Sequence, residues 1–143
     1  KLAPRKAKIV FFGGLDDVAL CAAEKMRKKY GNENIFGFSD GTSNETINSV
    51  NPQIIFVGVG SPKQEKWIAE NMEKIPSGKI FMGAGGAFDF ISGKVKRAPK
   101  LVREMGLEWL FRLILQPFRW KRAIRATFVF MTVALKDIFY PAP

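Results

Sequence analysis

Short apolar runs alternate with helix-forming segments along the first part of the chain, and the runs are continuously apolar rather than striped. We expect strands at Lys8–Phe12, Ile35–Phe38, Ile54–Val57 and Lys79–Met82. Continuously apolar strands joined by helices are typical of a parallel sheet that is covered on both faces. The pattern predicts an α/β protein with an open, mostly parallel, Rossmann-like sheet and helices on both faces.

The intervening segments have helix signals. Asp16 or Asp17 can cap a first helix that runs to about Tyr30. Its apolar positions are Val18, Ala22, Met26 and Tyr30. We expect further helices around Glu45–Val50 and from Pro62 to about Met72.

The character of the chain changes after Gly93. Ten Lys and Arg residues stand against two acidic residues between Lys94 and Arg125, with no strand-like run. We expect helices at Ala98–Met105, Leu107–Gln116 and Pro117 to about Phe139. The predicted domains are an α/β body over residues 1–97 and a basic helical C-terminal appendage over residues 98–143.

Composition excludes several kinds of chemistry. The chain has 143 residues and no histidine, which excludes a His-based triad, a His general base and a His-ligated metal. Cys21 is the only cysteine, so no internal disulfide can form, and we expect a reducing compartment. We find no export signal, and expect that a chain beginning at Lys1 has lost residues upstream. The net charge of +10 indicates an anionic partner: nucleic acid, a phosphorylated ligand or a membrane surface.

Two glycines, Gly13 and Gly14, follow the first predicted strand, but their spacing is not G-x-G-x-x-G. Asp16 and Asp17 would also occupy the helix N-terminus, where a phosphate would otherwise bind. We interpret this turn as structural.

The segment "GVGSPKQE" after the third strand has two interpretations. In the first, Ser61 is the N-cap, Pro62 is the first helical residue, and Gln64 closes a capping box. In the second, Gly58 and Gly60 let the backbone approach a ligand at the carboxyl end of a central strand. There, Lys63 and the helix N–H groups would supply positive potential. The residues alone leave both open.

A further cluster, "GAGGAFDFISGKVKRAP", follows the fourth strand. Its glycines, including Gly85 and Gly86, are costly in backbone entropy unless a positive φ or a close approach requires them. Asp89 lies between two phenylalanines, and either caps local N–H groups or serves as a ligand or acid/base carboxylate.

Together, "VGVGSPKQEKWI", "GAGGAFDFISGKVKRAPK" and "GLEWLFRL" resemble the WecG/TagA/CpsF glycosyltransferase family. The resemblance is strong from about Ile54 to Arg122 and looser from Lys8 to Val50. It implies inverting, metal-independent transfer of a hexosyl group, N-acetylmannosaminyl in named members, from a UDP-sugar to a polyprenyl-diphosphate-linked sugar. Residues 1–97 would then be a nucleotide-sugar-binding body, with no cofactor beyond the donor.

The resemblance also implies site residues. Gln64 matches the family's P-K-Q-E glutamine, and the two glycine segments would surround the nucleotide-sugar. The substrate-binding candidates are Gly58, Gly60, Lys63, Gly85, Gly86, Asp89 and Arg97.

Two departures from the family pattern bear on catalysis. Family members carry an upstream half with a proposed catalytic Asp and an active-site Thr, to which nothing in these 143 residues corresponds. The segment from Gly37 to Val50 is also shorter than usual. The alternative function is therefore a catalytically incomplete fragment that acts as a basic module on a membrane surface or nucleic acid. Against nucleic acid, no such motif is present and the tail aromatics recur at helical spacing.

The tail predicts an amphipathic helix. Its apolar stripe is Ile124, Phe128, Met131, Leu135 and Ile138. The apolar run Ala126–Leu135 has ten residues, against the ~20 needed to span a bilayer. We expect the helix to lie on the anionic inner face of the bacterial cell membrane, as a peripheral cytoplasmic protein. The competing interpretation buries the stripe in the domain or in a homo-oligomer interface.

Arg112, Arg119 and Arg122 fall within about 80° of one another on a helical wheel. They match arginines implicated in activity in the family's C-terminal appendage. Guanidinium groups match phosphate oxygens. The resemblance thus implies that these three arginines and Gln64 are the catalytic residues, and that no metal takes part.

Overall fold

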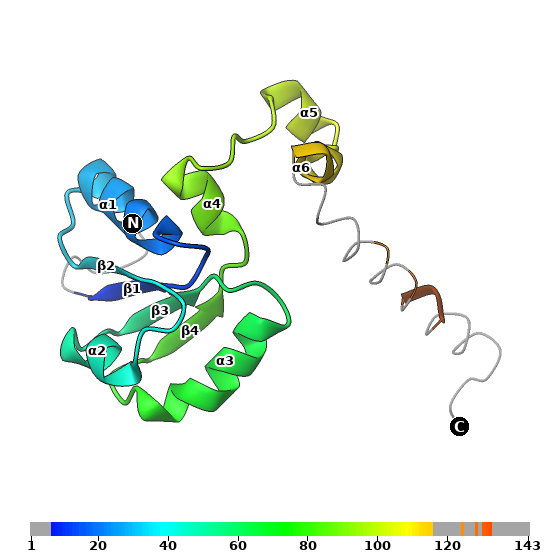
Figure 1. The fold of residues 1–143 in the computed structure, drawn as a ribbon. Coiled ribbons are helices and arrows are strands. Elements are labelled where there is room, and N and C mark those ends of the chain that lie inside the picture. Colours follow the sequence, from blue (N-terminus) through cyan, green and yellow to red (C-terminus); the bar gives the residue numbers. More distant parts are fainter. Residues whose placement is uncertain (1–6, 116–123, 125–127, 129, 133–143) are drawn as a thin grey trace. The chain divides into compact units, whose positions relative to one another are not determined.

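The computed structural model describes residues 7–115, 124, 128 and 130–132. Four strands form one parallel sheet: β1 (Ile9–Phe12), β2 (Ile35–Phe38), β3 (Ile54–Val57) and β4 (Ile80–Gly83). Their spatial order is β2-β1-β3-β4 (Figure 1). The predicted open, parallel, Rossmann-like α/β sheet is confirmed. Strand β1 begins one residue later than predicted, and β4 is shifted by one residue.

Helices cover both faces of this sheet. They are α1 (Val18–Tyr30), α2 (Asn44–Ser49), α3 (Lys63–Asn71) and α4 (Ala87–Ser92), with a 3-10 turn, η1 (Met72–Lys74), after α3. Figure 1 shows α1 and α4 on one face and α2 and α3 on the other. The sequence pattern does not predict α4, because six residues are too few to show a helical period.

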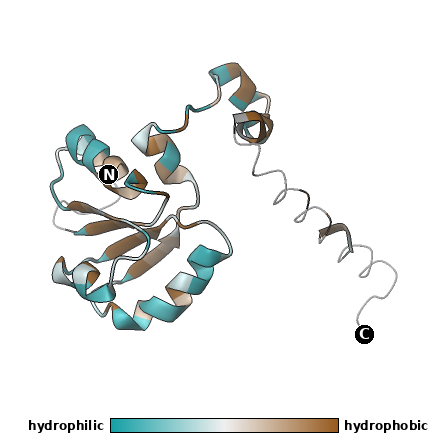
Figure 2. Cartoon of the chain, in the orientation of Figure 1, coloured by the Kyte–Doolittle hydropathy of each residue, from teal (hydrophilic) through white to brown (hydrophobic). Residues whose placement is uncertain are grey.

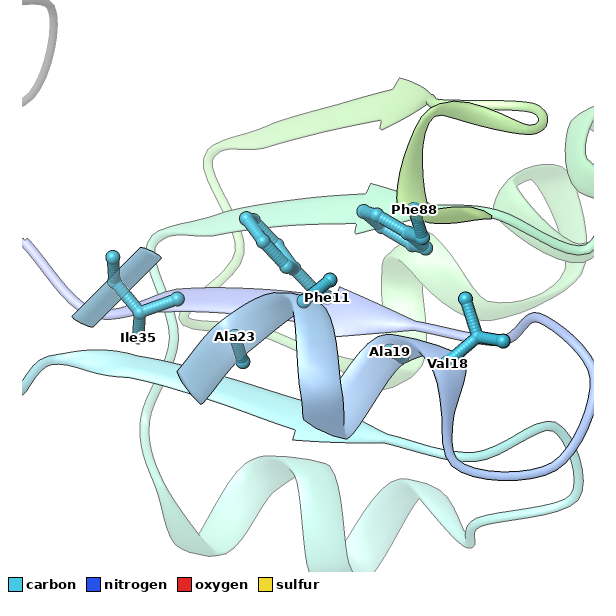
Figure 3. Close-up of a cluster of buried hydrophobic side chains, with 7 residues drawn as sticks. Phe11, Val18, Ala19, Ala23, Ile35 and Phe88 are labelled. Atoms are coloured by element: carbon cyan, nitrogen blue, oxygen red, sulfur yellow. The ribbon is translucent and has the colours of Figure 1, made fainter. Parts of the chain in front are cut away.

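Each face carries its own apolar cluster, and β1 contributes to both because successive side chains of a strand point to opposite faces. Phe11 packs with α1 and with Phe88 of α4 (Figure 3), where the two rings stack with centroids 4.8 Å apart. Val10 and Phe12 face α2 and α3, and Phe12 stacks on Trp67 at 4.3 Å. Figure 2 shows the strands as the apolar centre of this body. Burial accounts for the unbroken apolar runs of β1, β2 and β3, whereas β4 is largely exposed.

Helix α1 approaches the sheet closely because its inner face is small. Ala19, Ala22 and Ala23 are fully buried there. A Cβ on Gly37 of β2 would lie 2.5 Å from the carbonyl oxygen of Ala19, so only glycine fits at that point. Tyr30 does not continue the buried stripe as predicted: it is 61% exposed, because the helix ends there on left-handed Gly31.

The side chain of Asp17 does not cap α1, contrary to the prediction. Asp17 occupies the N-cap position, but its carboxylate bonds no helix amide. One oxygen accepts from Cys21 Sγ at 3.3 Å, and the other pairs with Lys94 Nζ. A lysine 77 positions away therefore outcompetes the local cap.

Residues 97–143 form a second compact unit, separate from residues 1–96. It contains α5 (Lys100–Glu104), which is shorter than predicted, and α6 (Glu108–Leu115), which begins one residue later than predicted. Extended backbone at Pro99 delays the start of α5, and a left-handed Gly106 separates the two helices.

Part of the predicted tail helix can be compared with the structure. The backbone is helical at residues 124, 128 and 130–132, while the rest of Pro117–Phe139 lies outside the described residues. The described members of the apolar stripe, Ile124, Phe128 and Met131, are 54–72% exposed. Among the described residues, no helix has both the length and the apolar character needed to cross a bilayer.

Candidate functional site

The strand order places a topological switch point between β1 and β3. The chain leaves β1 for a helix on one face and leaves β3 for a helix on the other, although the two strands are neighbours (Figure 1). Open α/β sheets bind their ligands outside the carboxyl ends of strands at such points. The turns that follow β1, β3 and β4 all lie at this edge.

The glycine turns after β3 and β4 converge. Gly85 N–H donates to Gln64 Oε1 at 2.9 Å, which joins the start of α3 to the turn after β4. A Cβ on Gly58 would lie 3.4 Å from Gly85 O and 2.5 Å from Cε2 of Phe88. The structure thus brings together Gly58, Gln64 and Gly85, and whether they hold a ligand stays a prediction.

Gln64 does not close a capping box, and Ser61 is not the N-cap of α3. Pro62 holds that position without a side-chain cap bond, and α3 begins at Lys63. The Gln64 amide instead bridges two partners, because Nε2 donates to Glu65 Oε1 at 2.9 Å while Oε1 accepts from Gly85. The capping box does not form because the N–H of Gly85, 21 residues away in the turn after β4, bonds the Gln64 oxygen instead.

The predicted glycines meet different demands. Gly60 and Gly85 adopt left-handed backbone, with φ of 83° and 52°, which favours glycine. Gly86 holds the N-cap position of α4 with an ordinary φ of −87°. Gly58 faces the ring of Phe88, so close packing already explains its missing side chain.

The polar candidates are more scattered. Lys63 is exposed at the first residue of α3. Asp89 is half-buried on α4, and its backbone carbonyl accepts from Ser92 Oγ and Val95 N, each at 3.1 Å. Both interpretations of its carboxylate remain open.

The arginines belong to the second unit. Arg97 Nε lies 3.7 Å from Glu108 Oε1, within that unit. Arg112 lies on α6, while Arg119 and Arg122 lie outside the described residues. Within the part of the chain that the structure describes, no three acidic or Cys side chains are grouped to hold a metal ion.

An ion pair supports the structural interpretation of the first glycine turn. The bond from Lys94 lowers the pKa of the Asp17 carboxyl, and the same pair raises the pKa of the Lys94 ammonium. The hydrogen bond to Asp17 raises the pKa of the Cys21 thiol. Lys25 Nζ also donates to Ser92 O at 2.5 Å. These contacts fasten α1 to α4 and to the segment that follows it.

Sequence reasoning missed three residues that build this region: Phe88, Glu65 and Lys94. Phe88 and Ile91 both pack into the apolar cluster between α1, α4 and the sheet, called here the α1-side cluster, but two apolar positions three residues apart are too few to predict a helix. For Glu65 and Lys94 the sequence offers no signal, because their partners are set by side-chain orientation and by the tertiary fold.

Comparison with known proteins matches nearly the whole length of the chain. Residues 1–142 match the model of the family described as "Glycosyl transferase WecG/TagA/CpsF family". The chain is also similar to the N-acetylglucosaminyldiphosphoundecaprenol N-acetyl-beta-D-mannosaminyltransferase of Bacillus subtilis (strain 168), with 38% identity over 149 aligned positions. That alignment covers 97% of this chain and 58% of the relative, so the chain spans well under two thirds of the relative's length.

Proposed function

Because the chain belongs to the WecG/TagA/CpsF glycosyltransferase family, we propose that it acts in inverting transfer of a hexosyl group from a UDP-sugar to a polyprenyl-diphosphate-linked sugar. The name of the Bacillus relative supports an N-acetylmannosaminyl group and a GlcNAc-diphosphoundecaprenol acceptor. Such a reaction belongs to the synthesis of teichoic acid or another cell-surface polysaccharide.

One observation carries the donor site: the hydrogen bond from Gly85 N to Gln64 Oε1, which joins two glycine turns at the carboxyl edge of the sheet. We place the UDP-sugar there. Lys63 and the N-terminal amides of α3 offer positive potential to a diphosphate. The Gln64 amide keeps one N–H and one lone pair beyond its two protein bonds, and these can orient sugar hydroxyls.

The leaving group of this reaction is a nucleoside diphosphate, which gains negative charge as the glycosidic bond breaks. We propose that Arg112, Arg119 and Arg122 supply the counter-charge. A guanidinium can bond two phosphate oxygens at once, and such preorganised donors stabilise charge that develops in the transition state. These arginines would replace a metal ion in that role.

The acceptor is lipid-linked, so we propose that the second unit lies on the inner face of the cell membrane. Four large apolar side chains of α5, α6 and the turn after α5 are 63–70% exposed: Leu101, Met105, Trp109 and Ile114. Basic residues accompany them, including Lys100 and Arg103. Apolar side chains beside basic ones are typical of helices that lie in the interface of an anionic membrane.

Calorimetric titration of the full 143-residue chain with UDP tests the donor site. We expect UDP to bind, and Gln64→Ala to weaken binding while leaving the fold intact. Lys66→Ala is the matched control, because Lys66 is exposed on the same helix and pairs only loosely with Glu70, at 3.7 Å. Equal binding by wild type and Gln64→Ala would contradict the placement.

A second titration separates the competing functions. A basic module for nucleic acid would bind single-stranded oligonucleotides with strong salt dependence and ignore UDP. A nucleotide-sugar site would bind UDP, retain it at moderate salt and show no preference for oligonucleotides over a simple polyanion.

A further inference from the structure

The amide of Gln64 is held at both ends, although the family resemblance points to Gln64 alone. Its oxygen accepts from Gly85 N and its nitrogen donates to Glu65 Oε1, each at 2.9 Å. We propose that Glu65 is a positioning residue that fixes the orientation of the Gln64 amide and so holds the turn after β4. The effect on ligand binding rests on the proposed function of the site.

The two partners of Gln64 differ in a way that fixes the amide. A backbone N–H can only donate, and an ionised carboxylate can only accept. Turning the amide over would set its NH₂ against Gly85 N–H and its oxygen against Glu65. Both hydrogen bonds would become repulsive contacts, so Glu65 selects the orientation in which the oxygen meets Gly85.

Because Gln64 is tightly packed, the orientation of its amide determines which of its atoms can contact a ligand. A Cβ on Gly83 would lie 2.8 Å from Gln64 Cδ and closer still to Nε2, so the amide rests against the bare backbone of β4. Only one N–H and one lone pair of the amide are left for a ligand. Because Glu65 and Gly85 each use one defined atom, they also decide where the remaining donor and acceptor lie.

Glu65 has a competing explanation, since it lies in the first turn of α3. A negative charge there is favourable toward the helix dipole wherever its oxygens point. Two variants separate the roles. Glu65→Gln removes the charge and keeps an acceptor oxygen, whereas Glu65→Leu removes both.

The test uses the full chain and two readouts. The first is hydrogen exchange of the Gly85 amide by NMR, and the second is UDP titration. We expect Glu65→Leu to accelerate hydrogen exchange at the Gly85 amide about tenfold, which is the factor that corresponds to the net free energy of one hydrogen bond. UDP affinity should fall by a similar factor, and Glu65→Gln should keep both values close to wild type.

Glu70→Leu is the control, because Glu70 is exposed on the same helix and pairs only with Lys66 among the ion pairs of α3 that the structure describes. Should Glu65→Leu fail to fold, Glu65→Ala serves in its place. If the Gly85 amide exchanges at the wild-type rate in Glu65→Leu, or in its substitute Glu65→Ala, the proposal is overturned. It is also overturned if Glu65→Gln accelerates this exchange as much as Glu65→Leu does. If the wild type does not bind UDP, the proposed function fails, while the exchange at Gly85 still decides the role of Glu65.

Discussion

The glycine at position 58 has two explanations, close packing and ligand binding, and the substitution Gly58→Ala can distinguish them. The sequence predicts that Gly58 lets the backbone approach a ligand. The structure places the ring of Phe88 against it, with Cε2 only 2.5 Å from where a Cβ would stand and Cδ2 closer still. Gly58→Ala should therefore destabilise the fold by disturbing the α1-side cluster.

Two opposing effects set the size of this loss. Overpacking a filled core costs about 1–3 kcal/mol. Replacing glycine where φ is not positive gains roughly 0.4–1 kcal/mol through the unfolded chain, and Gly58 is absent from the positive-φ glycines. Phe88 cannot move away freely, because it is 3% exposed and stacks on Phe11. Overpacking wins, and we expect a net loss of about 1–2 kcal/mol.

Urea unfolding of the full chain measures the effect. With an m-value near ~2 kcal/mol/M, the midpoint should fall by about 0.7 M. Phe88→Leu on its own should also destabilise, since it shrinks a buried ring. In the double variant the smaller Leu accommodates the new methyl group, so the combined loss should be at least about 1 kcal/mol less than the sum.

Gly41→Ala is the control for this cycle. Gly41 is also a glycine, with a φ of 92°, but no atom lies within 4 Å of a Cβ placed there, so an alanine would meet no packing partner. Its cost should simply add to that of Phe88→Leu. Additive losses for Gly58→Ala and Phe88→Leu would refute the packing explanation. Unchanged stability with lost UDP binding would show that Gly58 serves the ligand.

Four further outcomes are expected. Lys94 holds the pKa of Asp17 below its ordinary 3.8, so the stability from this pair is complete above about pH 4 and is lost as pH falls through the folded pKa. In Asp17→Ala the urea midpoint should therefore fall less steeply below pH 4 than in the wild type. An equally steep fall in both proteins would count against the pair. The same variant should speed alkylation of Cys21 at pH 8.5, since its thiol pKa is raised above 9.0 chiefly by the bond to Asp17; equal rates in both proteins would contradict this. Ending the chain at Gln116 should weaken sedimentation with anionic vesicles without abolishing it, because the exposed apolar side chains of α5 and α6 remain; neutral vesicles are the comparison, and undiminished binding would show that the tail adds nothing to it. In a complete enzyme of the family, Arg112→Lys should lose much of the turnover although it keeps the charge, because lysine cannot bond two phosphate oxygens at once; full activity in the lysine variant would show that only the charge of the arginines matters.

The sheet could be predicted from the sequence because its central strand β1 contributes apolar side chains to the clusters on both faces. Val10, Phe11 and Phe12 must all be apolar when successive side chains enter opposite clusters, so the run itself reports the sheet. Helix ends were harder to predict. At Ser61 and Asp17 the sequence offers a good local cap, and the structure does not use either side chain as one.

The physical reason is that a cap competes with every other partner that tertiary structure supplies. Asp17 meets the ammonium of Lys94, and the Gln64 oxygen meets the N–H of Gly85. Both partners come from segments that follow β4, whose position is set only when the sheet forms. Rules that read a few neighbouring residues cannot include them.

The same limit applies to the glycines of the candidate site. A sequence shows that Gly58, Gly83 and Gly85 recur near strand ends, and this correctly indicates a special edge of the sheet. It does not show which demand each one meets. Gly85 has a left-handed backbone, whereas Gly58 makes room for Phe88 and Gly83 makes room for the Gln64 amide. Two of the three are therefore shaped by side chains 19 or more positions away, so the site edge is a packed structure before any ligand arrives. Substituting these glycines should separate their roles. Gly83→Ala should release the Gln64 amide from Gly85 while leaving the core intact, whereas Gly58→Ala should destabilise the core itself.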